Sequence, residues 1–383
     1  MPIQVSGVQY SGIWSLAGQA NAVALTTWPV PPGPALYGWG GNSSGQLGLG
    51  STSNKSSPNQ VGALINWLVV ASGYSSTVAT KTDGTLWSWG SNASGQLGLG
   101  NTTSYSSPKQ VGALTAWSAV YPGTNHCVAI KTDGTLWSWG DNTDGQLGLG
   151  NTTAYSSPKQ IGALTDWQRS SSLRSHNLAI KTNGTLWSWG YNNSGQLGLG
   201  NITNYSSPKQ IGALTTWLTA IAGGYSSLAV KTDGTLWAWG NNAYGALGDG
   251  TTVNKSSPIQ IGALTTWATV FAGERNSGAI KTAGTLWMWG LNSNGQLGTG
   301  NLTYYSSPKQ IGALTNWSKA TTNTFTSAIK TDGTLWTWGY NGLGSLALGN
   351  TTNYSSPKQV GFLTNWTSLS GGLSYAQLAI ALA

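Results

Sequence analysis

The sequence has 383 residues, of which 55 are glycine and 22 are tryptophan, and only 7% of them are charged. Nine carboxylates and two histidines leave few titratable groups that could converge in a catalytic site, so we expect no enzyme and no catalytic residues. The formal net charge of +8 is compatible with nucleic-acid binding. Most lysines, however, recur at two repeat positions, which predicts dispersed circles of solvated side chains, and we do not expect nucleic acid as a partner.

The cysteine and histidine content indicates neither a disulfide nor a metal site. Cys127 is the only cysteine and no CxxC or HxxxH spacing is present, so we expect no metal and no cofactor. His126 and His176 occupy the same position in two neighbouring repeats, and we interpret both as exposed loop residues. The sequence shows no secretory signal and no apolar run long enough to span a membrane.

Residues 1–34 come first in the chain and differ from the rest. They contain a degraded copy of the later repeat, followed by the run PVPPGP at positions 29–34. A proline run cannot lie in a central strand and is typical of a stiff connector. We therefore predict that residues 1–34 form an N-terminal arm outside the repeat domain. The alternative is an eighth, incomplete blade.

From residue 35 onward, one unit recurs with a period of about 50 residues. Its marker is the dipeptide Trp-Gly, which is shifted by one residue in the last copy. The tryptophans of the seven dipeptides are Trp39, Trp89, Trp139, Trp189, Trp239, Trp289 and Trp338. A period in this range is typical of propellers, solenoids and arrays, in which a single unit cannot bury its apolar face alone.

One period contains four candidate strands, which we name A to D in chain order. Within residues 117–164, strand A begins at Trp117, strand B begins at Val128, strand C is TLWSWG and strand D is KQIGAL. The Asp133-Gly134 dipeptide between strands B and C predicts a two-residue hairpin with a type I′ turn. No segment of the repeat shows helical periodicity, so we predict an all-β fold.

Strand C is apolar on both of its faces. Trp137 and Trp139 are two residues apart and point to one face, whereas Leu136 points to the other. Such a strand must be covered on both sides, as it is in a propeller blade that packs between two neighbours. We therefore predict that the repeated tryptophans build the core and do not form a ligand cage.

The two ends of the repeat region predict how the ring closes. The first strand C begins near Leu36, and the C-terminal segment from Trp366 onward supplies only strands A and B. Counting in this way gives seven strands of each kind. We therefore predict that residues 35–383 form a seven-bladed β-propeller of four-stranded antiparallel blades, closed by exchange between the N- and C-terminal strands.

The repeats differ from one another mainly in the A–B and C–D connections. Both connections emerge at the same edge of an up-and-down sheet, so the variable segments share one face of the disc, where a rigid scaffold can hold functional loops. The candidate partner-binding residues on this face are His126, Asp141, Asp144, Arg169, Arg174, His176, Tyr191, Tyr225, Tyr244, Glu274 and Arg275. The alternative is that exposed loops simply tolerate change after duplication.

The motif WGxNxxGQLGLG, followed by SPKQ, resembles the repeats of the regulator of chromosome condensation family over about residues 36–383. The resemblance implies a seven-bladed β-propeller. The family includes a guanine-nucleotide exchange factor, a plant ultraviolet photoreceptor and bacterial inhibitors of β-lactamase, so the fold does not fix the activity. The insertion wedge of the exchange factor and the Gly-Trp-Arg-His-Thr context of the photoreceptor are absent from this sequence.

Two functional hypotheses follow for a non-enzymatic interaction scaffold. The leading one is an exterior virion structural protein, such as a phage tail, fibre or capsid-decoration component. Its arm would attach to the particle, and its variable face would bind a neighbouring subunit or a host receptor, a glycan receptor included. The alternative is a soluble regulator of a partner protein that is exchange-factor-like or inhibitor-like. The first predicts a virion or extracellular location and the second a cytoplasmic one; the oligomeric state stays open.

Overall fold

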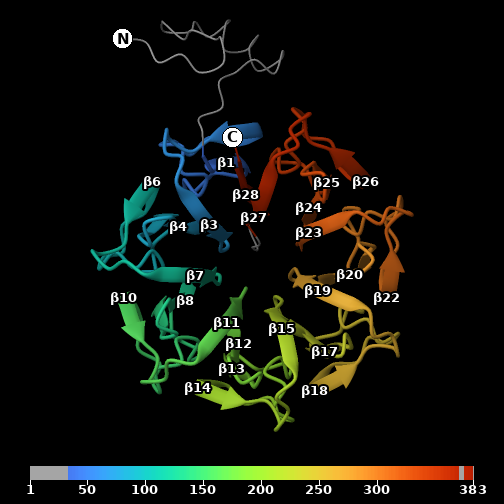
Figure 1. Cartoon of the computed structure of the whole chain (residues 1–383), viewed down its shortest axis with the longest axis horizontal. Helices are drawn as coiled ribbons and strands as arrows, with labels where there is room; N and C mark the ends of the chain where they lie inside the picture. Colours follow the sequence, from blue (N-terminus) through green and yellow to red (C-terminus); the bar gives the residue numbers. More distant parts are fainter. Residues whose placement is uncertain (1–32, 371–374, 383) are drawn as a thin grey trace, which may run out of the picture.

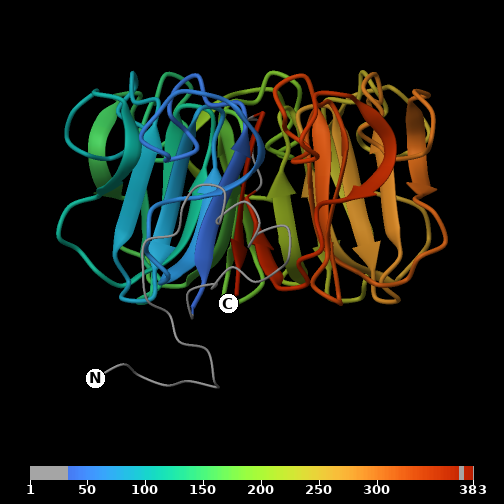
Figure 2. The ribbon, with the colours of Figure 1, turned by 90° about the horizontal axis from the view of Figure 1, so that it is seen from above.

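The computed structural model describes residues 33–370 and 375–382, and within these ranges it contains 28 strands and no helix. The strands form seven four-stranded sheets, which stand as blades around a central axis (Figure 1). Seen from the side, the blades form a thick disc with loops at both ends (Figure 2). The predicted all-β, seven-bladed β-propeller is confirmed. None of the described segments is a helix that could cross a membrane.

Each blade runs from strand A near the axis to strand D at the rim. The A strands are β3 (Trp67–Ser72), β7 (Trp117–Pro122), β11 (Trp167–Ser172), β15 (Trp217–Ala222), β19 (Trp267–Ala272), β23 (Trp317–Thr322) and β27 (Trp366–Leu369). The B strands are β4 (Ser76–Lys81), β8 (His126–Lys131), β12 (His176–Lys181), β16 (Ser226–Lys231), β20 (Asn276–Lys281), β24 (Phe325–Lys330) and β28 (Ala376–Ala381).

The outer two strands of each blade complete the sheet. The C strands are β5 (Leu86–Gly90), β9 (Leu136–Gly140), β13 (Leu186–Gly190), β17 (Leu236–Gly240), β21 (Leu286–Gly290), β25 (Leu335–Gly339) and β1 (Ala35–Gly40). The D strands are β6 (Tyr105–Gln110), β10 (Tyr155–Gln160), β14 (Tyr205–Gln210), β18 (Lys255–Gln260), β22 (Tyr305–Gln310), β26 (Tyr354–Gln359) and β2 (Lys55–Gln60).

We number the blades around the ring and name its two faces. Blade 1 is β3–β6, blade 2 is β7–β10, blade 3 is β11–β14, blade 4 is β15–β18, blade 5 is β19–β22 and blade 6 is β23–β26. The closing blade is β27, β28, β1 and β2. The loop face is the end of the disc where the A–B and C–D loops emerge. The turn face is the opposite end, with the B–C turns and the D–A segments.

The closing blade joins the two ends of the chain as predicted. Its strand order is β2-β1-β28-β27, and Leu36 of β1 lies opposite Ile380 of β28. The indole of Trp39 donates to the carbonyl of Ser345 in blade 6 at 3.1 Å, so β1 is also tied to the preceding blade. No disulfide takes part, because Cys127 is a buried free thiol. The prediction of an arm at residues 1–34 stays a prediction, because residues 1–32 lie outside the described residues.

Tryptophans form the core of every blade, and they meet edge to face. The ring of Trp117 at the start of strand A lies 6.0 Å from Trp137 and 6.1 Å from Trp139, at 74° and 71°. Leu136, which points to the other side of strand C, is fully buried against the neighbouring blade. Large aromatic side chains in this arrangement bury much apolar surface and favour T-shaped contacts. The tryptophans therefore have the structural role that the sequence predicts.

The lysines at the end of strand B are buried in four blades and partly buried in two, which corrects the expectation of solvated side chains. Lys81 is only 5% exposed, and its ammonium lies 3.6 Å from the ring centroid of Trp87 and 5.1 Å from that of Trp67. Burial lowers the pKa of the lysines at this position in four blades. Contact with two tryptophan faces stabilises the buried cation. This circle of lysines belongs to the core and presents little charge to a partner.

The turn between strands B and C also differs from the prediction. In a type I′ turn, both Asp133 and Gly134 would have positive φ. Only Gly134 does, with φ of 77°, and its N–H donates to the carbonyl of Lys131 at 3.0 Å. The link is therefore a longer hairpin loop that ends on a left-handed glycine. Asp133 accepts hydrogen bonds from the N–H and hydroxyl of Thr135, which holds the turn closed.

Strand D begins earlier than predicted. In blade 2 it is β10, with the sequence YSSPKQ, whereas the predicted segment KQIGAL lies mostly beyond its end. A proline inside this strand is tolerated because strand D is the outer edge of the blade, where one side of the strand has no partner. Edge prolines also hinder pairing with another chain. The position of Pro158 and its counterparts follows from this edge role.

Candidate protein-interaction face

A constant asparagine organises the C–D loops on the loop face. Asn142, which follows the Trp-Gly dipeptide, is completely buried. Its Nδ2 donates to the carbonyls of Asn151 and Thr153 at 3.0 and 2.9 Å, and its Oδ1 accepts the N–H of Leu147 at 2.9 Å. A buried amide with all these bonds pins a loop that has no regular structure. The exposed loop residues therefore sit on a fixed base.

Among the described A–B loops, which lie near the axis, several bond to the loop of the next blade. The N–H of Thr124 donates to the carbonyl of Arg174 in the next blade at 3.1 Å, and that of Gly224 donates to Gly273 at 2.9 Å. A Cβ on Gly224 would come within 2.6 Å of the Cα of Glu274, so this close approach requires glycine. The loops thus form a collar at the axial end of the loop face (Figure 1).

A charged and aromatic contact spans three blades of this collar. Arg174 of blade 3 forms an ion pair with Glu274 of blade 5, with an Nη1–Oε1 distance of 2.6 Å. The Arg174 guanidinium also lies 4.4 Å from the ring centroid of Tyr225, which belongs to blade 4. Residues that are about fifty and a hundred positions apart are therefore brought together by the ring. Three of the candidate partner-binding residues meet here.

A second contact lies farther out on blades 4 and 5. Arg275 donates to the hydroxyl of Tyr244 at 2.9 Å, and its guanidinium lies 4.9 Å from the centroid of the same ring. Tyr244 packs in turn against Tyr304, with the ring centroids 6.2 Å apart. Tyr304 is 46% exposed. Tyr304 was not among the predicted site residues, although the other repeats carry only asparagine, serine or alanine at its position.

Apolar side chains are exposed in the C–D loops of the same three blades. Ile202 in blade 3 is 64% exposed, Val253 in blade 4 is 61% exposed and Leu302 in blade 5 is 58% exposed. Ile202 and Leu302 share one repeat position and Val253 occupies the next one, and every other blade has serine or threonine at both positions. Comparison of the repeats at these two positions would have found the three residues. Together with Arg174, Tyr225, Tyr244, Glu274, Arg275 and Tyr304, they define what we call the blade 3–5 sector.

The remaining acidic and aromatic candidates have mainly local contacts. Asp141 in blade 2 accepts a hydrogen bond from Gln146 at 2.8 Å, and Asp144 accepts one from Asn204 of blade 3 at 3.2 Å. Burial raises the pKa of Asp144, and the charge of Asp141 adds to this effect. Both carboxylates therefore stabilise C–D loops beside the blade 3–5 sector. Tyr191 is half-buried at the start of the C–D loop of blade 3.

The two histidines are buried, which corrects the prediction of exposed loop residues. His126 and His176 are the first residues of β8 and β12. The Nε2 of His126 is hydrogen-bonded to Asn177 Oδ1 at 2.9 Å, and that of His176 to the hydroxyl of Ser227 at 3.0 Å, each in the next blade. Burial lowers the pKa of both, that of His176 to about 3. The two histidines therefore connect neighbouring blades and are not accessible to a partner.

Arg169 is also not a loop residue. Arg169 lies within β11, the strand of blade 3 that is closest to the axis, and its side chain is exposed. Its predicted place on the loop face is therefore wrong, because the A–B loop of blade 3 begins only after Ser172. The thiol of Cys127 is buried, and burial raises its pKa. Within the described residues, no group of three or more His, Cys, Asp or Glu side chains could hold a metal ion.

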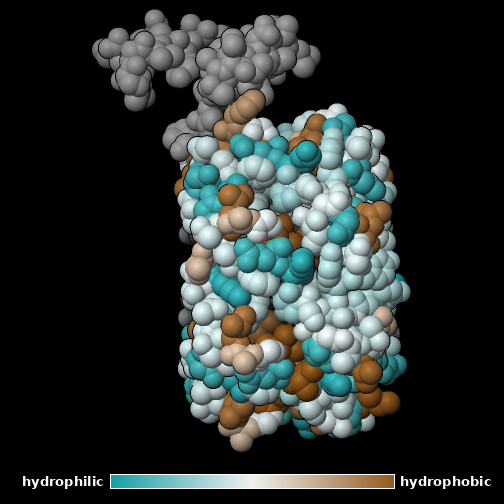
Figure 3. All heavy atoms as spheres, turned by 90° about the vertical axis from the view of Figure 1, so that its right-hand side faces the viewer, coloured by the Kyte–Doolittle hydropathy of each residue, from teal (hydrophilic) through white to brown (hydrophobic). Residues whose placement is uncertain are grey.

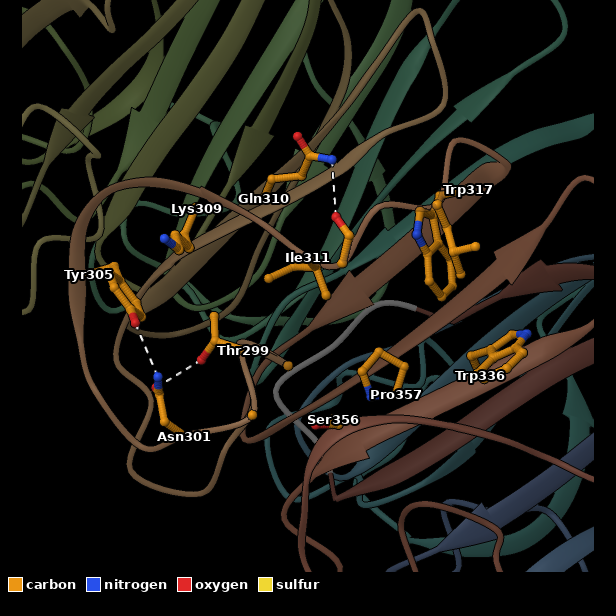
Figure 4. A pocket seen from close by; sticks show the side chains of 14 residues that line it. Thr299, Asn301, Tyr305, Lys309, Gln310, Ile311, Trp317, Trp336, Ser356 and Pro357 are labelled. Atoms are coloured by element: carbon orange, nitrogen blue, oxygen red, sulfur yellow. Dashed lines mark hydrogen bonds between the residues drawn. The ribbon is translucent and has the colours of Figure 1, made fainter.

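A groove lies at the rim, in the seam where blades 5 and 6 pack against each other. Its volume is about 610 Å³, and its walls include Tyr305 and Lys309 of β22 and Trp317, Trp336 and Pro357 of blade 6 (Figure 4). On this side of the disc, apolar surface lies in recesses that polar residues border (Figure 3). The groove is separate from the blade 3–5 sector on the loop face.

Family models match the repeats that the structure shows. The regulator of chromosome condensation (RCC1) repeat matches residues 35–80, 83–130, 133–180, 183–230, 233–280, 283–322 and 332–376. A second model of the same repeat matches residues 69–96 and 119–146. Among curated protein sequences, no significant match is found.

Solved structures with the same fold share little sequence with this chain. The crystal structure of human WBSCR16 aligns with a TM-score of 0.82 and 22% identity, over 91% of this chain and 99% of that one. Yeast RCC1 (Prp20) bound to Kap60 aligns with a TM-score of 0.81 and 16% identity, over 99% of this chain and 94% of that one. Prp20p from Saccharomyces cerevisiae aligns with a TM-score of 0.79 and 18% identity, over 92% of each chain.

At these identities, the likeness to solved structures shows the fold alone. The family assignment comes instead from the repeat model, whose seven consecutive matches follow the period of the blades and together cover most of the sequence. The chain therefore belongs to the regulator of chromosome condensation (RCC1) repeat family.

Proposed function

We propose that this protein is a non-catalytic recognition scaffold that regulates a partner protein, and that the partner binds the blade 3–5 sector. The observation that carries the proposal is the gathering of arginine, tyrosine and exposed apolar side chains on three consecutive blades. Tyrosine and arginine are the residues that most often dominate binding energy in protein interfaces. Contacts such as Arg275–Tyr244 order these side chains before binding and so lower the entropic cost of association.

The comparisons support a regulator more than a virion protein. The structures of the yeast relative name Kap60, Gsp1p and histones as proteins that it binds. Those partners belong to the yeast protein, and the low identity does not bring them to this chain. They do show that a propeller of this family can bind proteins. None of the comparisons supports a phage, virion or adhesive role, so the alternative hypothesis of the sequence analysis becomes the preferred one.

Site-specific photo-crosslinking tests which face binds the partner. A photoreactive amino acid replaces Tyr304 on the loop face or, as a control of similar exposure, Leu114 on the turn face; the two residues are 46% and 50% exposed. We expect a discrete adduct from position 304 in an extract of the source cells and none from position 114. An adduct formed only from position 114 would assign the partner to the turn face.

A second measurement connects binding to regulation. Once the adduct identifies the partner, its activity is measured with and without the propeller, including nucleotide exchange if the partner is a GTPase. The variant Arg275→Ala should weaken the effect on that activity in proportion to its weaker binding. If the partner binds the sector and its activity does not change, the protein is a binding scaffold only, and the regulatory part of the proposal is wrong.

A further inference from the structure

One residue distinguishes the seam between blades 5 and 6 from most other seams. In five of the seven seams, a leucine from the C–D loop packs against the aromatic cluster of the next blade. These residues are Leu49, Leu99, Leu149, Leu199 and Leu348. The seam between blades 5 and 6 has Thr299 instead, and Thr299 lines the groove of about 610 Å³. The smaller side chain therefore leaves space that leucine fills elsewhere.

The groove has an aromatic wall and a set of hydrogen-bond donors. Trp336 and Trp317 of blade 6 face Tyr305 and Lys309 of β22 across the groove (Figure 4). The Nε1 of Trp317 is buried without a hydrogen-bond partner, as is that of the first tryptophan of strand A in every other blade, so this atom does not distinguish the groove. Lys309 adds an ammonium group. None of the fourteen residues that line the groove carries a carboxylate.

The hydrogen bonds within the groove also leave donors free. The Nδ2 of Asn301 donates to the hydroxyl oxygen of Tyr305 at 3.2 Å, so the Tyr305 proton can point outward. The Oδ1 of Asn301 already accepts the hydroxyl of Thr299 at 2.9 Å. A matching ligand should therefore have apolar surface and many acceptors, but few donors.

A proline-rich segment in the polyproline II conformation has these properties. Prolines have no N–H, and the carbonyls of this helix point outward without internal hydrogen bonds. Aromatic-lined grooves are the usual binding sites for such segments. Strand β22, whose residues Tyr305, Lys309 and Gln310 line the groove, is roughly 20 Å long, and six residues in the polyproline II conformation span about 19 Å.

We propose that this groove binds the proline-rich segment at residues 29–34 of a second copy of this chain. The segment PVPPGP holds four of the 13 prolines, and no comparable run occurs elsewhere in the sequence. In the same chain, the carbonyl of Pro34 accepts the N–H of Trp67 at 3.4 Å, which fixes the end of the segment at blade 1. The groove lies two seams farther around the ring, so the segment reaches it only from another molecule. This contact is independent of the partner that binds the blade 3–5 sector.

A peptide of residues 27–36 tests the recognition directly. Its binding to the full-length chain is followed by fluorescence polarisation of a labelled peptide. The variant Thr299→Leu restores the residue that five other seams contain, so it should fold, and we expect it to weaken binding at least tenfold. Thr299→Ser keeps the groove open and should bind like the parent chain. Equal binding by Thr299→Leu, or by a peptide with alanine at positions 29, 31 and 32, would overturn the proposal.

Sedimentation equilibrium of the full-length chain tests the contact between copies. The parent chain should self-associate with increasing concentration. A chain with Pro31→Ala and Pro32→Ala should not, and neither should Thr299→Leu. A mixture of the two variants should restore a heterodimer, since one supplies an intact groove and the other an intact segment. Self-association of either variant alone to the same degree as the parent chain would show that copies meet through another surface.

Discussion

The two faces of the disc come from the same repeats but differ in what varies between blades. On the turn face, the B–C turns are nearly identical, and a side chain such as Asp133 caps the turn from the outside. On the loop face, the constant residue is the buried Asn142, and the residues above it change from blade to blade. The exposed residues of a loop can therefore vary between blades when the side chain that fixes the loop is buried beneath them. This difference explains why the candidate site lies on the loop face.

The largest effect should come from removing the buried support of the loop face. Asn142→Ala deletes four hydrogen bonds and leaves the Leu147 N–H, two carbonyls and the Asn151 Oδ1 to find other partners. Buried groups left without partners cost roughly 1–3 kcal/mol each, and partial relaxation should limit the total loss of unfolding free energy to about 3 kcal/mol. Equilibrium denaturation measures this loss.

The matched change on the turn face is Asp133→Ala. This carboxylate is exposed, and water can replace its bonds to Thr135, so the melting temperature should change little. If the two substitutions lowered stability equally, the distinction between a face supported from beneath and a face capped from outside would fail.

The next largest effect is a loss of stability in acid, which should originate beneath the loop face. The pKa of His176 is lowered to about 3 by burial, so the folded chain keeps it neutral while the unfolded chain binds a proton below its ordinary value. Its contribution is therefore complete above pH 6.5 and is lost as the pH falls. At pH 4.5 the loss should be about 3 kcal/mol relative to neutral pH.

Denaturation series at several pH values measure this loss of stability. A substitution at His176 tests whether this residue causes it. Blade 4 has Ser226 at the corresponding position, so His176→Ser is the natural replacement. The variant should be less stable at neutral pH because the bond to Ser227 is lost, but its stability should fall less steeply with acid. An unchanged slope would place the acid sensitivity elsewhere.

A change on the surface of the loop face should affect binding more than stability. Arg275→Ala removes the contact with Tyr244 and should weaken partner binding about tenfold, or about 1.4 kcal/mol. Unfolding free energy should change by less than about 0.5 kcal/mol, as is usual for surface substitutions. Leu114→Ala on the turn face is the control, and a larger loss of affinity there would reverse the assignment of the faces.

The sequence predicts the ring well because each period of about 50 residues corresponds to one blade, and the same core residues recur in every blade. Each Trp-Gly dipeptide places one tryptophan such as Trp139 in the core, and the unequal ends at Leu36 and Trp366 predict the shared closing blade. Strand limits were less predictable. Strand D was predicted to begin at Lys159, but it begins at Tyr155 and includes Pro158, which the edge of the blade tolerates.

The candidate site could be predicted only in part, because it depends on distances across blades. Arg174 and Glu274 were both candidates, but nothing local in the sequence shows that residues a hundred positions apart are paired. His126 and His176 resemble loop residues, because the A–B loop is shorter than the variable segment that contains them. The burial of these two histidines depends on contacts with the neighbouring blade, which the sequence around each histidine does not show.

The smallest effect, and the sharpest test of order within the blade 3–5 sector, concerns the ion pair between Arg174 and Glu274. Both side chains are partly exposed, at 39% and 33%, so solvent should screen the attraction and the coupling free energy should be about 0.5 kcal/mol. A double-mutant cycle with Arg174→Ala and Glu274→Ala measures it, and the value should decrease with added salt. Because Arg174 also packs on Tyr225, Arg174→Ala should cost more than Glu274→Ala. Equal costs would mean that the charge alone holds the arginine, and the collar would then depend on ionic strength in a way that the turn face does not.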